Sequence, residues 1–122
     1  MTRNYKNIVA WQRAHQLTLA IYQHTKEFPS DEKFGITSQI RRAAYGVAAN
    51  IVEGSARDSK KDYLRFLTVA MSSLKEVEYF LLLSMDLGYL ESESFEEISE
   101  IVNGTMRPLH GLIQAVRQQV QK

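Results

Sequence analysis

Apolar residues recur at steps of three and four along four segments of this chain, and no segment shows the strict alternation of a half-buried strand. The segments cover roughly 8–27, roughly 37–56, a stretch after Ser59, and a stretch that starts near Ser92 or Ser94. Steps of three and four place side chains on one face of an α-helix, so each segment predicts an amphipathic helix. Four such helices with short connections predict an all-α fold, an antiparallel up-and-down four-helix bundle.

Residues typical of helix ends support these boundaries. Ser59 with Asp62 fits an N-terminal capping box, and Gly88 stands where a left-handed residue ends a helix. Pro108 falls inside the fourth helix, but the residue four positions earlier is Gly104, so a kink is expected and not a break.

The apolar stripes predict which side chains enter the core. The first helix is expected to bury Ile8, Trp11, Ala14, Thr18, Ile21 and Thr25. The third is expected to bury Tyr63, Phe66, Leu67, Ala70, Leu74, Val77, Leu81 and Met85. The fourth is expected to bury Phe95, Ile98, Val102, Thr105, Leu109, Leu112, Val116 and Val120.

The second helix divides into three faces when its residues are placed at 100° intervals. The core stripe is Ile36, Ile40, Ala43, Ala44, Val47 and Ile51. A polar flank consists of Gln39, Arg42, Gly46, Asn50, Glu53 and Arg57. The side facing away from the core carries Arg41, Tyr45, Ala48, Ala49, Val52 and Ala56. This outer face is small and apolar where a solvated helix should carry charges, so it predicts contact with another subunit.

The end of the third helix carries the same signal. The stretch VEYFLLLSMDLGYL is apolar almost all round, with Tyr79, Phe80 and Leu83 off the core seam. A helix that is apolar on every side is buried on every side. Both surfaces together predict a homo-oligomer.

Length and composition fit one domain, residues 1–122, without disulfides, because the chain has no cysteine. No stretch approaches the ~20 apolar residues of a membrane span, and the N-terminus lacks the apolar run of a signal peptide. We therefore expect a cytoplasmic protein without membrane contact. The net charge is only +1, but residues 1–75 hold 12 Lys/Arg against 6 Asp/Glu, and residues 76–122 hold 3 against 8. A basic face on the first three helices is compatible with this distribution.

The polar flank and its neighbours have two interpretations. In a structural one, Glu53 pairs with Arg57, Arg42 reaches Glu76, and Asn50 satisfies backbone groups at a helix boundary. In a functional one, six basic side chains face a polyanion such as RNA or DNA: Arg41, Arg42, Arg57, Lys60, Lys61 and Arg65. Lys60 and Lys61 suit phosphate best, because helix N-terminal amides also favour anions.

The sequence contains no motif that predicts catalysis. His15, His24 and His110 lack metal-ligand spacing, and neither a phosphate-binding glycine loop nor a nucleophile motif is present. We expect no catalytic residues, no metal and no cofactor, and a protein that is not an enzyme.

Four stretches resemble a known family: YKNIVAWQRAHQLTLAIYQHT, FPSDEKFGITSQIRRAA, NIVEGSAR and FLTVAMSSLKEVE. They are similar to the small bacterial four-helix-bundle proteins named after open reading frames in intervening sequences of 23S rRNA genes. The resemblance implies a four-helix subunit and a homopentameric ring. The family is also distantly similar to the accessory protein of diversity-generating retroelements, a basic pentameric barrel that binds nucleic acid and a reverse transcriptase.

Two functions follow as hypotheses. One is a non-catalytic oligomeric accessory protein that binds RNA or DNA without sequence specificity through a basic patch. The other is a homo-oligomeric scaffold that binds another protein and has no nucleic-acid role. Salt dependence distinguishes them, because phosphate binding weakens steeply with salt.

Overall fold

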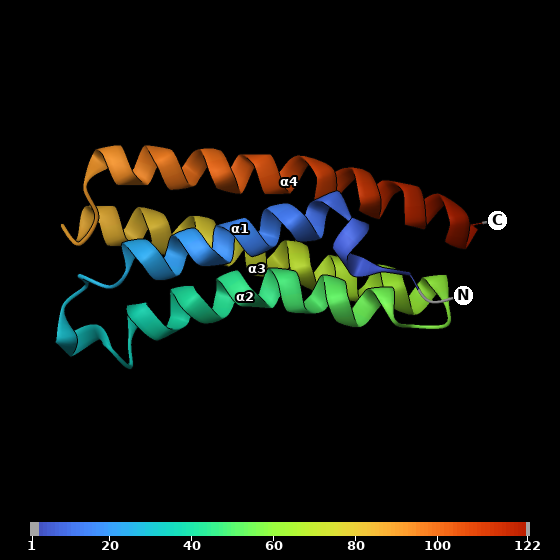
Figure 1. Ribbon diagram of the computed structural model, residues 1–122, viewed down its shortest axis with the longest axis horizontal. Helices are drawn as coiled ribbons and strands as arrows, with labels where there is room; N and C mark the ends of the chain where they lie inside the picture. Colours follow the sequence, from blue (N-terminus) through green and yellow to red (C-terminus); the bar gives the residue numbers. More distant parts are fainter. Residues whose placement is uncertain (1–2, 122) are drawn as a thin grey trace.

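The computed structural model describes residues 3–121, and within them it contains helices and no strand. The four long helices are α1 (Val9–His24), α2 (Ile36–Ser55), α3 (Lys60–Asp86) and α4 (Ser92–Gln121). A short 3-10 helix precedes α1 (η1, Tyr5–Asn7), and another precedes α2 (η2, Ser30–Glu32). Each helix packs against the next one in the chain and α4 packs against α1, with successive helices antiparallel (Figure 1). The predicted all-α four-helix bundle is confirmed.

The two ends of the bundle differ in what they gather. The α1–α2 connection and the α3–α4 turn lie together at one end, called here the loop end (Figure 1). The α2–α3 connection lies at the opposite end with η1, and this end is called the junction end. At the loop end, the Tyr89 hydroxyl donates to a Glu32 carboxylate oxygen at 2.8 Å, and the Phe28 and Tyr89 rings lie 5.7 Å apart.

No helix within residues 3–121 is both long and apolar enough to cross a bilayer.

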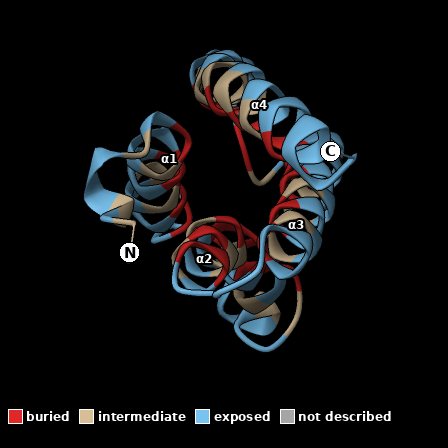
Figure 2. Ribbon diagram, turned by 90° about the vertical axis from the view of Figure 1, so that its right-hand side faces the viewer, coloured by how far each residue is buried: buried red, intermediate tan, exposed pale blue. Residues whose placement is uncertain are grey.

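Buried residues line the inward faces of all four helices (Figure 2). The core stripe predicted for α2 is buried in full: Ile36, Ile40, Ala43, Ala44, Val47 and Ile51. Burial of an aliphatic side chain as large as Ile or Leu contributes roughly 1.5–3 kcal/mol, so these stripes supply the main stabilisation of the bundle.

The stripe predicted for α1 was right for Ala14, Ile21 and Thr25, which are buried, and the remaining positions are shifted by about one residue. The helix buries Ala10 and Leu17, whereas Trp11 and Thr18 are only half-buried. Both sets repeat at steps of three and four, so periodicity alone could not choose between them. In the fold, the Trp11 indole stacks on the His15 ring with centroids 5.1 Å apart, at the border of the core.

The other deviations have similar causes. In α4, Ile113 is buried instead of the predicted Leu112, and Val120 is 37% exposed near the end of the helix. In α3, Phe66 and Met85 are half-buried, and Ser84 takes an inward position. For Leu112 and Met85, the neighbouring residue one position away is the buried one.

Close packing explains part of the small-residue run in α2. A Cβ atom on Gly54 would lie 2.9 Å from Phe66 Cβ and 3.0 Å from Tyr63 Cδ1. Only glycine allows the backbone of α2 to approach α3 this closely.

Gly88 has φ of +81°, as expected for the residue that ends α3. The helix α4 continues through Pro108.

Candidate nucleic-acid interface

The six basic candidates lie in two groups and not on one continuous face. Arg41 and Arg42 belong to the first half of α2, towards the loop end, whereas the other four belong to the junction end. A helix rises 1.5 Å per residue, so Arg41 and Arg57 are separated by about 24 Å along the axis of α2. A single phosphate group cannot contact both.

At the junction end, two guanidinium groups share one aromatic ring. The Arg57 and Arg65 guanidinium carbons each lie 4.7 Å from the centroid of the Phe66 ring. Such contacts hold a cation in place and still leave its N–H donors available to a ligand. No ion pair joins Glu53 to Arg57 among residues 3–121, so the predicted pair is replaced by the contact with Phe66.

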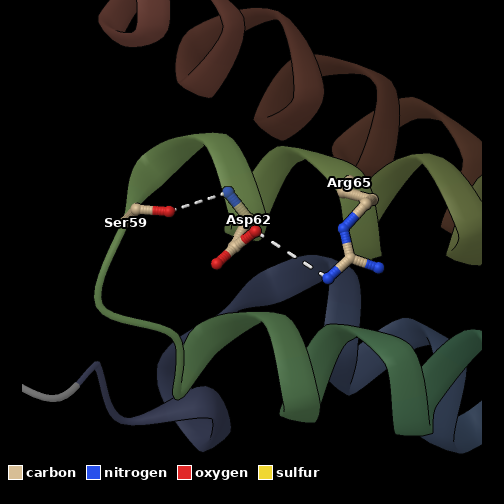
Figure 3. Close-up of polar contacts among 3 residues, drawn as sticks. All are labelled: Ser59, Asp62 and Arg65. Carbon is tan, nitrogen blue, oxygen red and sulfur yellow. Dashed lines mark hydrogen bonds and ion pairs between the residues drawn. The ribbon is translucent and has the colours of Figure 1, made fainter.

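The start of α3 is capped from within the same cluster (Figure 3). The Ser59 hydroxyl accepts a hydrogen bond from the Asp62 backbone N–H at 3.0 Å, as the capping pattern predicted. The Asp62 carboxylate lies 3.8 Å from the Arg65 guanidinium, and both side chains are exposed. Lys60 and Lys61 are exposed in the first turn of α3, where backbone N–H groups lack partners within the helix.

Arg3 joins this cluster and was missed in the sequence. Its Nη1 donates to the carbonyl oxygens of Ser55 and Arg57, both at 3.2 Å, and its guanidinium lies 4.3 Å from the Tyr63 ring centroid. Burial raises the pKa of the Tyr63 hydroxyl above its ordinary value of 10.0, and the Arg3 charge partly opposes that shift. Arg3 precedes every helix, so periodicity gave no signal for its position.

The junction patch is the name used below for the cationic residues of this end. It consists of Arg3, Arg57, Lys60, Lys61 and Arg65. Two carboxylates, Asp58 and Asp62, lie within the same stretch of chain and reduce its positive potential. The patch therefore keeps an excess of positive charge, with at least three of its cations held against aromatic rings.

The two arginines nearer the loop end have different surroundings. The Arg41 Nε–H donates to the Thr25 hydroxyl at 2.9 Å, and the guanidinium lies 4.6 Å from the Tyr22 ring centroid. Arg42 is exposed beside a groove of about 380 Å³ between α2 and α3 that Glu76 also lines. Among residues 3–121 no ion pair joins Arg42 to Glu76, so the predicted pair is not formed.

Asn50 lines the same groove from α2. Its Nδ2 donates to the Gly46 carbonyl oxygen at 2.7 Å. The expected bond to backbone is present, but it lies one turn back within α2 and not at a helix boundary.

The candidate subunit interface is open in the single chain. On α2, Tyr45, Ala49 and Ala56 are exposed, and Ala48 and Val52 are half-buried. On α3, Tyr79 is 57% exposed, whereas Phe80 and Leu83 are half-buried because they pack against the core. Leu82, which was not among the predicted residues, is 45% exposed on the same part of α3.

No cluster of three or more metal-ligating side chains occurs within residues 3–121. The closest His–carboxylate approach is His24 Nε2 to Glu97 at 3.5 Å, between α1 and α4. His15 is exposed and stacks on Trp11.

Known proteins resemble this chain in fold and in sequence. The crystal structure of a protein of unknown function from the S23 ribosomal protein family, from Bacteroides thetaiotaomicron, has a TM-score of 0.79, with 87% of this chain and 96% of that chain covered. The two are 23% identical, so this likeness concerns the fold alone. No curated protein shows significant sequence similarity. Residues 6–111 match the family described as 23S rRNA-intervening sequence protein, which confirms the resemblance seen in the motifs, and the chain belongs to that family.

Proposed function

We propose that this protein is a non-catalytic, oligomeric accessory protein of the cytoplasm that binds RNA or DNA without sequence specificity. The observation that carries the proposal is the junction patch. It combines exposed lysines at a helix N-terminus with arginines held on aromatic rings, at one end of the bundle.

The arrangement suits phosphate groups for two physical reasons. Arg57 and Arg65 are restrained by Phe66, so less side-chain entropy is lost when a phosphate binds. Lys60 and Lys61 stand beside the free backbone N–H groups of α3, whose dipole adds positive potential. The Asp58 and Asp62 carboxylates oppose both effects, so we expect each subunit to bind weakly.

Sequence tolerance follows from the same geometry. Contacts to phosphate fix position but carry no base information. Binding should therefore depend steeply on salt and little on sequence.

Assembly would multiply the weak contacts. The outer face of α2 and the exposed Tyr79 and Leu82 on α3 support a homo-oligomer, and the family resemblance implies a pentamer. Each subunit repeats the junction patch, so linked sites bind a long polyanion with an affinity well above that of one site.

The first experiment measures assembly. Sedimentation equilibrium should give a mass several times 14.0 kDa at micromolar concentration. Ala49→Arg places a charge on the exposed face of α2 and should yield folded monomers. The control Gln16→Arg, at an exposed position of α1, should leave the mass unchanged. A wild-type mass of 14.0 kDa contradicts assembly.

The second experiment measures binding of oligo(U) and duplex DNA at two salt concentrations. Lys60→Glu with Lys61→Glu should weaken binding by roughly ten- to a hundredfold and lower the slope of log affinity against log salt by about 2. The matched control, Arg13→Glu with Arg107→Glu, makes the same change in net charge at exposed sites away from the junction end and should have a smaller effect. If the assembled wild type binds neither probe at low salt, the nucleic-acid function fails, and a scaffold that binds another protein takes its place.

A further inference from the structure

A hollow of about 310 Å³ lies at the loop end, between α1, the η2–α2 connection and the start of α2. We call it the aromatic hollow, and its lining residues are Tyr22, Lys33, Phe34, Thr37, Ser38, Arg41 and Tyr45. Three of them are aromatic and unusually open: Phe34 is 86% exposed, Tyr45 45% and Tyr22 39%. An aromatic ring left this exposed loses the burial energy that normally keeps such side chains inside, so it suggests an absent partner.

Cations accompany the rings. The Lys33 Nζ lies 5.5 Å from the Phe34 ring centroid, and Arg41 lies over Tyr22. The bond to Thr25 uses only the Nε–H of Arg41, which leaves its Nη–H groups as donors for a ligand.

No acidic side chain lines the hollow. The nearest acids in sequence are Asp31 and Glu32. Glu32 accepts from the Tyr89 hydroxyl at 2.8 Å and from the Ile36 backbone N–H at 3.3 Å, so its carboxylate is held at the start of α2. Carboxylates thus stand near the cations at both ends of the bundle, although none lines the hollow itself.

An unpartnered hydroxyl lies in the same wall. Thr37 retains 9% of its exposure, and its Oγ1 is shielded from solvent with no hydrogen-bond partner among the described residues. Buried polar groups in native structures are almost always paired, and this one is unpaired in a residue that lines the hollow. Thr37 and Ser38 also belong to the first turn of α2, where the Ile36 N–H already donates to the Glu32 carboxylate.

We propose that the aromatic hollow takes one unpaired base of a single-stranded nucleic acid. The base stacks on Phe34, the most exposed of the three rings, and an adjacent phosphate lies beside Lys33 and Arg41. Aromatic rings with neighbouring cations are the means by which proteins hold single strands without reading sequence. This inference rests on the proposed function and adds a preference for single strands, because a base inside a duplex is not free to stack on a protein ring.

The test uses the full-length protein and fluorescent oligo(U), oligo(dT) and a DNA duplex of the same length. Wild type should bind both single strands more tightly than the duplex. Phe34→Ala should weaken single-strand binding by roughly tenfold, the size of one lost stack, and leave duplex binding unchanged, whereas Phe34→Tyr keeps the ring and should restore it. Leu19→Ala, at an exposed apolar residue of α1, is the matched control and should have no effect.

The outcomes separate the two proposals. If wild type binds nucleic acid but Phe34→Ala binds all three probes equally well, the aromatic hollow is not a base site, and the junction patch alone explains binding. If Phe34→Ala changes the mass in sedimentation, the hollow is a contact between copies of the chain and the inference is overturned. Tyr45 belongs to the outer face of α2, so this outcome is a direct competitor. If wild type binds none of the probes, both proposals fail together.

Discussion

The two ends of the bundle hold their arginines in different ways. At the junction end, Arg57 and Arg65 lie on Phe66, a side chain of α3 that also packs closely against Gly54. At the loop end, Arg41 lies on Tyr22 and donates to Thr25, while Phe34 stands almost fully exposed. The same pairing of arginine with an aromatic ring thus belongs to a tight helix contact at one end and to an open hollow at the other.

This difference separates two ways of binding a polyanion. The junction patch presents charge around a rigid contact and suits phosphates. The aromatic hollow presents ring faces and suits bases. A protein with both, about 24 Å apart along α2 from Arg41 to Arg57, can hold a strand by its backbone at one end and by a base at the other.

Gly54→Val should have the largest effect and tests the rigidity of the junction end. The added atoms would overlap Phe66 and Tyr63, so we expect a loss of about 3 kcal/mol in the free energy of unfolding, measured in urea. Gly111→Val meets nothing within 4 Å and should change stability by less than about 0.5 kcal/mol. Equal effects at the two sites would mean that α2 and α3 do not pack closely.

Arg41→Ala asks whether the arginine at the loop end is structural. It removes a hydrogen bond and ring contact of a half-buried side chain, so we expect a loss of about 1.5 kcal/mol. Arg65→Ala removes a surface pair with Asp62 and a ring contact with Phe66, both made by an exposed side chain, and should cost less than about 1 kcal/mol. The reverse order in urea unfolding would show that the junction end, not the loop end, depends on its arginine.

Ser59→Ala tests the cap at the junction end. It leaves the Asp62 backbone N–H without its acceptor and should lower stability by about 1 kcal/mol. Ser99→Ala, inside α4, provides a serine change without a cap and should be close to neutral or slightly stabilising. A neutral Ser59→Ala would mean that water replaces the cap.

Alkaline pH should give the smallest effect, and its cause differs between the ends. Burial raises the pKa of Tyr63 at the junction end, and the hydrogen bond to Glu32 raises the pKa of Tyr89 at the loop end. The unfolded chain releases these protons first, so the stabilisation is complete below about pH 10 and is lost as pH rises through the folded pKa values.

The melting temperature measured between pH 9 and 11 checks this dependence. Tyr89→Phe should flatten the decline by removing the contribution of the loop end, and Tyr63→Phe should do the same for the junction end. An unchanged decline in both variants would assign it to other groups.

Much of the fold could be predicted because its signals are local. The cap at Ser59, the left-handed Gly88 and the core stripe of α2 each depend on residues within a few positions of one another. The residues that face the core were harder to predict in α1 and α4. Two sets of residues, one position apart, fit the same helical period there, and packing against neighbouring helices selected Leu17 and Ile113.

The candidate sites depended more on distant parts of the chain. Sequence identified the basic residues of α2 and α3, but it grouped Arg41 with Arg57 and assigned Arg57 to Glu53. Arg3 reaches the junction end only because η1 lies beside the end of α2.

By itself, the sequence determined four helices, their order, most of their ends and the inward face of α2, because backbone hydrogen bonds and apolar periodicity act within one helix. The tertiary structure alone decided which ring each arginine contacts, where Arg3 lies, and that Phe34, Tyr22 and Tyr45 surround one hollow. These contacts join residues from different elements, and their distances are set by how closely neighbouring helices pack, a quantity that no single helix specifies.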